Sequence, residues 1–253
     1  MMYNRRLFLQ KANLAAAGIV LAPVLPFSNP TASIVTKDIL LGKYTLTDTT
    51  LPFSTISTTY ASVAGMYMQT EAYTSFQKMH LAAKKEGVNL KIISAVRSFY
   101  QQKTIWENKW NGNTKVGGKN LAKTCPDAAT RALTILTYSS MPSTSRHHWG
   151  TDIDINSLLP SYFKTAKGKK EYEWLQKNGS MYGFCQVYNN KTLANRTGYE
   201  EEKWHWSYLP IAEKYLAAYL QTITYQDITG FLGAEVADDI QVIKLFVQGI
   251  AIH

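Results

Sequence analysis

Residues 145–156, with the sequence SRHHWGTDIDIN, concentrate side chains that can bind a metal ion. Two adjacent histidines, His147 and His148, are followed by two aspartates that are separated by one residue, Asp152 and Asp154. Because the whole chain contains only 5 histidines, chance would seldom place two of them beside these acids. Imidazole nitrogens and carboxylate oxygens are both common zinc ligands. The segment therefore indicates a metal site.

The second half of this segment, residues 151–156, alternates between polar and apolar side chains, which predicts a strand. Side chains on a strand point alternately to opposite faces, so Asp152 and Asp154 share one face. Ile153 and Ile155 then share the other face. We expect the two carboxylates to point into a cleft.

A further ligand is available from the segment KWHWSY at residues 203–208, which also alternates and predicts a neighbouring strand. His205 lies on one face of this strand, opposite three aromatic side chains. With His147 and Asp154 it supplies two imidazoles and one carboxylate, which leave one position of a tetrahedral zinc ion open for water. Catalytic zinc has such an open position and lowers the pKa of the water from ~15.7 toward ~7. Glu202, three residues before His205, can act as the general base and then protonate a leaving amine.

The motifs SRHHWGTDID and EKWH resemble two signatures of the VanY-like zinc D-alanyl-D-alanine carboxypeptidases, which are related to the lysostaphin and hedgehog folds. These signatures are Ser-x-His-(six residues)-Asp and Glu-x-Trp-His, and the segment ISAVRSFYQQ is similar to the arginine segment of the same family. The resemblance spans about Met68 to Leu209. It implies that Glu202 is the base and that Arg97 holds the substrate or stabilises the developing oxyanion. It implies these zinc ligands: His147, Asp154 and His205.

The function that the resemblance implies is removal of the C-terminal D-amino acid, D-Ala, from peptidoglycan stem peptides. One alternative is a zinc endopeptidase that cuts within stem peptides or cross-bridges. The other is a catalytically inactive zinc-containing module that binds the cell wall, and the presence of Glu202 argues against it. Both D,D- and L,D-carboxypeptidase specificity are compatible with these motifs.

Arg97 is expected at the end of a strand, where its guanidinium can grip a terminal carboxylate with two parallel hydrogen bonds. Such a clamp favours the carboxypeptidase over the endopeptidase. Three further residues of the same motifs are predicted substrate contacts: Ser98, Gln102 and Ser145.

Two metal-capable residues are not predicted to bind zinc. Asp152 stands where many family members have a small apolar residue, and we interpret it as a residue that orients a ligand, with altered specificity as the alternative. His148 is interpreted as a packing or hydrogen-bonding residue, because it is His147 that has the spacing of seven residues to Asp154.

The rest of the chain predicts an α+β fold, in which helices flank a small antiparallel sheet that carries the zinc site, as in hedgehog and DD-peptidase-like proteins. Apolar periodicity predicts these helices: 66–87, 98–110, 127–140, 167–179, 211–223 and 233–252. It predicts these strands: 88–96, 150–156, 183–188 and 203–208. We predict four regions: an export signal at 1–33, an extended lead-in at 34–65, the zinc carboxypeptidase domain at 66–220 and a helical C-terminal tail at 221–253.

The export signal is predicted from Arg5, Arg6 and Lys11, which precede an apolar run at residues 12–25. The run is too short for a comfortable membrane span, so we expect no stable span once the signal is removed. The sequence NRRLFLQK resembles a twin-arginine signal, and an ordinary secretory signal or an uncleaved anchor is the alternative. The predicted location is the periplasm or cell envelope.

The chain has a formal net charge of +9, and removal of the first 33 residues would take away three positive charges and no acidic ones. A basic protein suits an anionic envelope polymer, and we expect peptidoglycan stem peptides as its partner and a monomer as its state. Nucleic acid is a poor alternative, because the lysines are scattered and do not form one stripe. Cys125 and Cys185 could form one disulfide or stay free thiols.

Overall fold

The computed structural model describes residues 35–251, so the predicted export signal lies outside the described residues. The central element is a four-stranded antiparallel sheet in the order β3 (Ile92–Ser94), β4 (Asp152–Ile155), β6 (His205–Tyr208) and β5 (Phe184–Cys185). A separate antiparallel pair consists of β1 (Phe53–Thr55) and β2 (Tyr67–Gln69). The predicted α+β class with a small antiparallel sheet is therefore confirmed.

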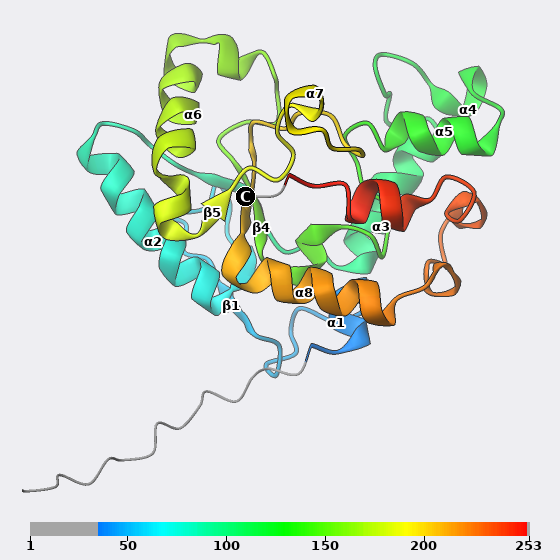
Figure 1. Ribbon diagram of the computed structural model, residues 1–253, viewed down its shortest axis with the longest axis horizontal. Coiled ribbons are helices and arrows are strands. Elements are labelled where there is room, and N and C mark those ends of the chain that lie inside the picture. Colours follow the sequence, from blue (N-terminus) through cyan, green and yellow to red (C-terminus); the bar gives the residue numbers. More distant parts are fainter. Residues whose placement is uncertain (1–34, 252–253) are drawn as a thin grey trace, which may run out of the picture. The chain divides into compact units, whose positions relative to one another are not determined.

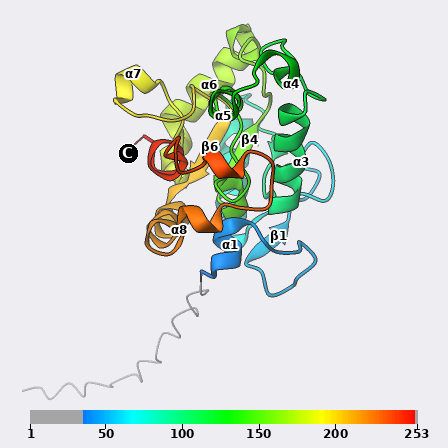
Figure 2. The same ribbon diagram turned by 90° about the vertical axis from the view of Figure 1, so that its right-hand side faces the viewer.

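Helices lie on two sides of the four-stranded sheet (Figure 1). One group contains α2 (Thr70–Lys85) and α6 (Ala166–Asn178), and the other contains α3 (Phe99–Trp110), α4 (Leu121–Thr124) and α5 (Ala128–Ile135). Figure 2 shows α3, α4 and α5 together on one side of β4 and β6. The short α7 (Lys191–Ala194) lies in the loop between β5 and β6, and α8 (Leu209–Thr222) follows β6.

The sheet divides the described residues into a packed face and a face that carries the site. Ile153 and Ile155 of β4 are buried in one core cluster with Phe76 of α2 and Trp206 of β6, as the predicted alternation requires. A second cluster joins side chains of α3 and α5 to the segment after α8. Asp152 and Asp154 lie on the opposite face of β4 from the two isoleucines, between these clusters.

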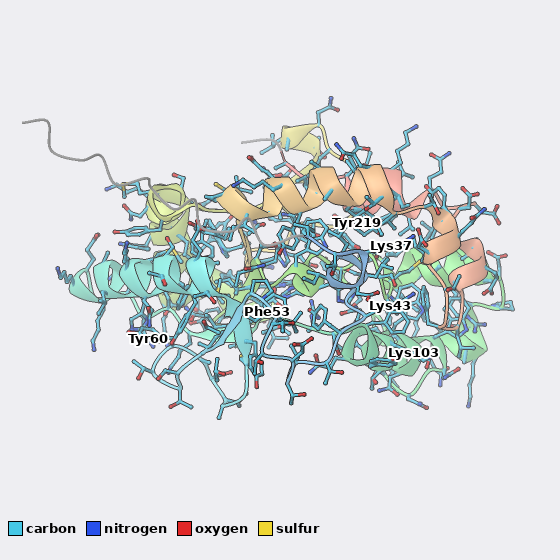
Figure 3. The ribbon with its side chains drawn as sticks, turned by 90° about the horizontal axis from the view of Figure 1, so that it is seen from below. Lys37, Lys43, Phe53, Tyr60, Lys103 and Tyr219 are labelled. Carbon is cyan, nitrogen blue, oxygen red and sulfur yellow. The ribbon has the colours of Figure 1, made fainter. Side chains whose placement is uncertain are left out.

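The predicted extended lead-in contains a helix, α1 (Lys37–Leu41). The Thr36 side chain caps it by accepting a hydrogen bond from the backbone N–H of Ile39, and Gly42 ends it with φ of 72°. Its apolar residues pack against Tyr215 and Tyr219 of α8. Figure 3 shows α1 beneath α8, with Lys37 and Tyr219 labelled. A helix of five residues has too few turns to show a period, which is why the sequence predicted no helix here.

The predicted helix at 233–252 is wrong as a single helix. The segment forms a 3₁₀ turn at Ala234–Val236 and a short π-helix at Ile243–Val247, with Gln241 between them at a φ of 50°. A positive φ interrupts a right-handed helix. The apolar residues that suggested a helix are instead buried against α3 and α5, among them Val236, Ile240 and Phe246.

The remaining irregular turns are at Arg146–Trp149, Tyr162–Lys164, Gly179–Tyr182 and Tyr225–Asp227. Cys125 and Cys185 are free thiols, so the disulfide alternative does not hold in this structure. Within residues 35–251, no helix is long and apolar enough to cross a membrane.

Candidate metal centre and its pocket

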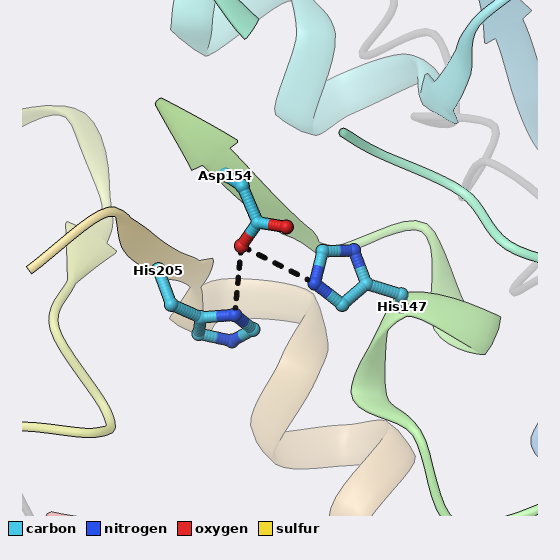
Figure 4. A group of neighbouring side chains, drawn as sticks. All are labelled: His147, Asp154 and His205. Atoms are coloured by element: carbon cyan, nitrogen blue, oxygen red, sulfur yellow. Dashed lines mark hydrogen bonds and ion pairs between the residues drawn. The ribbon is translucent and has the colours of Figure 1, made fainter. Parts of the chain in front are cut away.

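Three predicted ligands converge from different elements of the fold (Figure 4). His147 comes from the turn Arg146–Trp149, Asp154 from β4 and His205 from the first position of β6, and all three are buried. Asp154 is paired directly with His205 across the two strands. The nearest ligand atoms of the three lie within 4.8 Å of one another.

Gly150 lets the chain turn from His147 into β4. Its φ is +69°, and a Cβ at this position would lie 2.7 Å from a ring carbon of Phe53 and 2.9 Å from Val96. Any other residue would therefore be strained and crowded here. The glycine brings an imidazole from the turn to the same side of the sheet as the carboxylate of Asp154.

The hydrogen bonds of the two histidines leave one nitrogen of each directed at Asp154. His147 Nδ1 lies 2.7 Å from the carbonyl oxygen of Ala95, which can only accept, so Nδ1 carries the proton. His147 Nε2 is then free and lies 3.5 Å from Asp154 Oδ1. His205 Nε2 lies 2.8 Å from Asp152 Oδ2, and His205 Nδ1 lies 3.2 Å from the same Asp154 oxygen. Two nitrogens and one oxygen thus face one point.

The charges of His147, Asp154 and His205 favour a cation at the point that their ligand atoms face. Burial lowers the pKa of His205, but its hydrogen bonds to Asp152 and Asp154 outweigh this and raise the pKa to about 9. Burial raises the pKa of the Asp154 carboxyl, but His147 and His205 hold it well below its usual range. The site thus pairs an ionised buried carboxylate with a protonated His205, while burial lowers the pKa of His147, and a divalent cation can replace the extra proton of His205.

Asp152 lies behind His205 and is fully buried. Its carboxylate accepts hydrogen bonds from Arg146 Nε at 2.9 Å, Thr151 Oγ1 at 2.7 Å and Ser207 Oγ at 2.8 Å, besides the contact with His205. Four donors fix the carboxylate, and the carboxylate fixes the imidazole ring. This is the arrangement expected of a residue that orients a metal ligand.

The donor set fits zinc. Two neutral imidazoles and one carboxylate are a ligand set of catalytic zinc, and neither thiol of the chain is needed. Among residues 35–251, His147, Asp154 and His205 are the one grouping of such side chains close enough to hold a metal ion.

A pocket of about 620 Å³ opens onto the three residues, and Glu202 and Arg97 also line it. Glu202 is buried, and its Oε2 lies 3.8 Å from His205 Nδ1. Burial, with the nearby charge of Asp154, raises the pKa of Glu202 to about 7. A carboxyl group with such a pKa can both accept and donate a proton near neutrality.

Arg97 lies three residues beyond β3 and is tied to the metal group through its backbone. Its N–H donates to the carbonyl of His147 at 3.1 Å, and its carbonyl accepts from His148 Nδ1 at 2.6 Å. The Nε of Arg97 is buried and has no hydrogen-bond partner among the described residues. The guanidinium therefore keeps donors for a ligand in the pocket.

His148 lies outside the group formed by His147, Asp154 and His205. Its Nδ1 bonds to Arg97, its Nε2 accepts from the backbone N–H of Ser143 at 3.1 Å, and burial lowers its pKa to about 3. A neutral ring with both nitrogens engaged has no lone pair for zinc. His148 holds the turn that carries His147.

The other predicted substrate contacts lie outside the lining of this pocket. Ser98 caps α3 by accepting from the Gln101 N–H at 3.3 Å. Gln102 donates to the carbonyl of Ser140 at 2.7 Å, which places it behind a residue of the pocket wall. Gln102 Oε1 and Ser145 Oγ are buried without a partner among the described residues. Their contact with substrate stays a prediction.

Sequence reasoning missed several residues of the site. Arg146 lies inside the first motif but received no role, although it lines the pocket and pairs with Asp152. The ring of Tyr188 lies 4.4 Å from that of His205. Lys109 reaches the pocket from the last turn of α3. A local sequence pattern could have indicated Arg146, whereas Tyr188 and Lys109 arrive only through tertiary packing.

Comparison with known proteins places these residues in a family. The family model described as VanY, D-alanyl-D-alanine carboxypeptidase, matches residues 65–211. YodJ of Bacillus subtilis (strain 168), whose name assigns it to the carboxypeptidases, is 32% identical over 149 residues, which are 56% of this chain and 46% of YodJ. The D-alanyl-D-alanine carboxypeptidase of Enterococcus faecalis (strain ATCC 700802 / V583) is 30% identical over 136 residues, 53% of this chain and 46% of that protein. The match thus spans about half the length of these curated relatives.

Two solved structures are also similar. VanYB in complex with D-alanine-D-alanine has 25% sequence identity and a TM-score of 0.47, covering 68% of this chain and 89% of that one. The LdcB LD-carboxypeptidase has 25% identity and a TM-score of 0.48, covering 81% of this chain and 78% of its own. The family match covers more than half of the chain and includes the candidate ligands, Glu202 and Arg97. The chain therefore belongs to the VanY family of D-alanyl-D-alanine carboxypeptidases.

Proposed function

We propose that the chain is an exported zinc carboxypeptidase that removes the C-terminal D-amino acid, D-Ala, from peptidoglycan stem peptides. The observation that carries the proposal is the convergence of two imidazole nitrogens and the Asp154 oxygen in the lining of the pocket. Glu202 and Arg97 line the same pocket. A metal group, a general base and a cation for a terminal carboxylate are the parts that this hydrolysis needs.

A zinc ion held by His147, Asp154 and His205 would polarise the scissile carbonyl and lower the pKa of a water molecule. Glu202 accepts the proton of the attacking water at its carboxylate and later gives it to the leaving amine. Its raised pKa suits this exchange, and a neighbouring divalent cation would favour its charged form at the start. Asp152 keeps the His205 ring in place while charge develops.

Arg97 supplies the distinction from an endopeptidase. A free C-terminus carries a carboxylate, and an arginine with an unused buried Nε can bind it through charge-assisted hydrogen bonds. An endopeptidase substrate has an amide at that position and would leave the guanidinium unpaired. The buried position of Glu202 in the pocket argues against the inactive wall-binding module.

The metal assignment predicts near-stoichiometric zinc in the purified protein. His147→Ala, Asp154→Ala and His205→Ala should each lose most of the zinc, because each removes one donor. His148→Ala should melt at a lower temperature, since it loses two buried hydrogen bonds, but should keep its zinc. Metal analysis of the folded fraction decides, and loss of zinc in His148→Ala alone would overturn the ligand assignment.

The base assignment predicts that Glu202→Gln keeps its zinc but hydrolyses at least ~10²-fold more slowly, because an amide cannot accept the proton. Glu201→Gln is a matched control: Glu201 lies near the hydroxyl of Tyr172, at 3.5 Å, and is not part of the pocket lining. Rates on peptides with D,D and L,D termini should fall in the first variant only. Loss of activity in Glu201→Gln, with wild-type activity in Glu202→Gln, would assign the general base to Glu201.

The carboxylate clamp predicts that Arg97→Lys acts poorly on a peptide that ends in D-Ala. The lost paired contact is worth roughly 1.5–3 kcal/mol, about one to two decades in kcat/KM. Amidation of the peptide's C-terminus should harm the wild-type enzyme far more than the variant. Equal wild-type rates on amidated and free-acid peptides would refute the clamp and favour the endopeptidase.

Export predicts that the full chain accumulates in the periplasm or cell envelope of a bacterial host. Replacing Arg5 and Arg6 together with lysine should hold it in the cytoplasm if the twin-arginine pathway carries it. Cell fractionation and immunoblotting give the result. Export that persists in the double variant would indicate an ordinary secretory signal.

A further inference from the structure

The pocket carries more positive charge than a single carboxylate needs. Its basic residues are Arg97, Lys109, Lys115 and Arg146, and its acidic residues are Asp154 and Glu202. Arg146 is already compensated by its buried ion pair with Asp152 at 2.9 Å. Asp154 and Glu202 would face the metal ion. Three basic side chains are then left without a negative partner, and the proposed clamp uses only Arg97.

Lys109 is the best placed of the remaining two, because Lys115 is exposed on the loop after α3. The Lys109 side chain is only partly accessible, and its Nζ donates a hydrogen bond to Ser139 Oγ in the pocket wall. No ion pair within residues 35–251 includes Lys109. An ammonium has three N–H donors, so two remain for a ligand.

Lys109 is electrostatically coupled to the catalytic region but comes from a different part of the wall than Arg97. Burial and the charge of Arg97 lower the pKa of Lys109, while Glu202 acts in the opposite direction. Because a helix rises about 1.5 Å per residue, the ten steps from Phe99 to Lys109 span roughly 15 Å along α3, and Arg97 lies two residues before Phe99. The two residues therefore line the pocket from opposite ends of this helix, with their charges close enough to interact, and two such cations can bind two carboxylates of one ligand.

We propose that Lys109 forms a subsite for a second carboxylate of the substrate, carried on a side chain close to the scissile bond. The preferred class is then stem peptides that contain a diamino dicarboxylic acid with a free side-chain carboxylate. A stem peptide that has lysine in place of the dicarboxylic acid would bring a positive charge into a pocket that already has an excess of positive charge, and this repulsion lowers its affinity. The inference rests on the proposed function and adds its substrate class.

The test uses synthetic peptides that end in diaminopimelate-D-Ala or diaminopimelate-D-Ala-D-Ala, each with the side-chain carboxylate free or amidated. For the zinc-loaded wild-type enzyme, KM should be about tenfold lower for the free acid, the size of one charge-assisted contact. Lys109→Gln keeps a donor for Ser139 but loses the charge, and should remove this difference. Lys109→Arg should retain it. Lys119→Gln, a change of the same type at an exposed loop position outside the pocket lining, should behave as wild type.

Two results would overturn the subsite. Equal cleavage of the acid and amide peptides by wild type would refute it and leave the proposed function intact. A Lys109→Gln effect that is the same for both peptides, but vanishes when the C-terminus is amidated, would assign Lys109 to the terminal clamp. If no peptide is hydrolysed, the proposed carboxypeptidase activity fails, and calorimetric binding to the zinc-loaded protein still tests the subsite. Tighter binding of the free-acid peptide than of the amidated peptide, lost in Lys109→Gln, supports the subsite, and equal binding of the two peptides refutes it.

Discussion

The pairing of Asp154 with His205 across β4 and β6 is the contact on which the rest of the site depends. It sets a buried carboxylate oxygen 3.2 Å from one imidazole nitrogen and leaves room for His147 on the other side, at 3.5 Å. Burying an ionised carboxylate is costly unless a cation compensates it. Three features hold His147, Asp154 and His205 together: the register of β4 and β6, the turn at Gly150, and the backbone hydrogen bond from Arg97 to His147.

A second buried charge pair, between Arg146 and Asp152, lies beside this group. Asp152, two residues before Asp154 on the same face, is ionised and accepts hydrogen bonds from Arg146, Thr151 and Ser207. The guanidinium of Arg146 is itself fixed, since it stacks 4.8 Å from the ring of Trp149. A rigid Asp152 determines which nitrogen of His205 carries a proton. The other nitrogen is thereby kept available at the metal position.

The parts of the site that follow a local period could be predicted from the sequence. Alternation on β4 separates Asp152 and Asp154 from the buried isoleucines. The choice of His147 over His148 came from the resemblance to the family signature, not from a local period. Ser98 shows a limit of motif reading: it belongs to a capping box with Gln101, and this role explains its place before α3 without any substrate. The sequence signature of such a box, Ser followed three residues later by Gln, was available for that interpretation.

The wall of the pocket could not be predicted in this way. Lys109 and Tyr188 are brought beside the metal group by the packing of α3 and of the loop after β5, and neither position stands out in the sequence. Likewise, α1 is too short to show a period, and the segment after α8 is apolar enough for a helix but breaks at Gln241 to fill the core beside α3 and α5. Tertiary packing decides these elements.

X-ray absorption at the zinc edge of the loaded protein tests the central claim most directly, because it reports the atoms around the metal. The structure predicts a shell of nitrogen and oxygen only, with the scattering pattern of two imidazoles, and this pattern should be lost together with most of the zinc in His205→Ala. A sulfur scatterer, a third imidazole, or a spectrum unchanged by His205→Ala would contradict a zinc centre built from His147, Asp154 and His205.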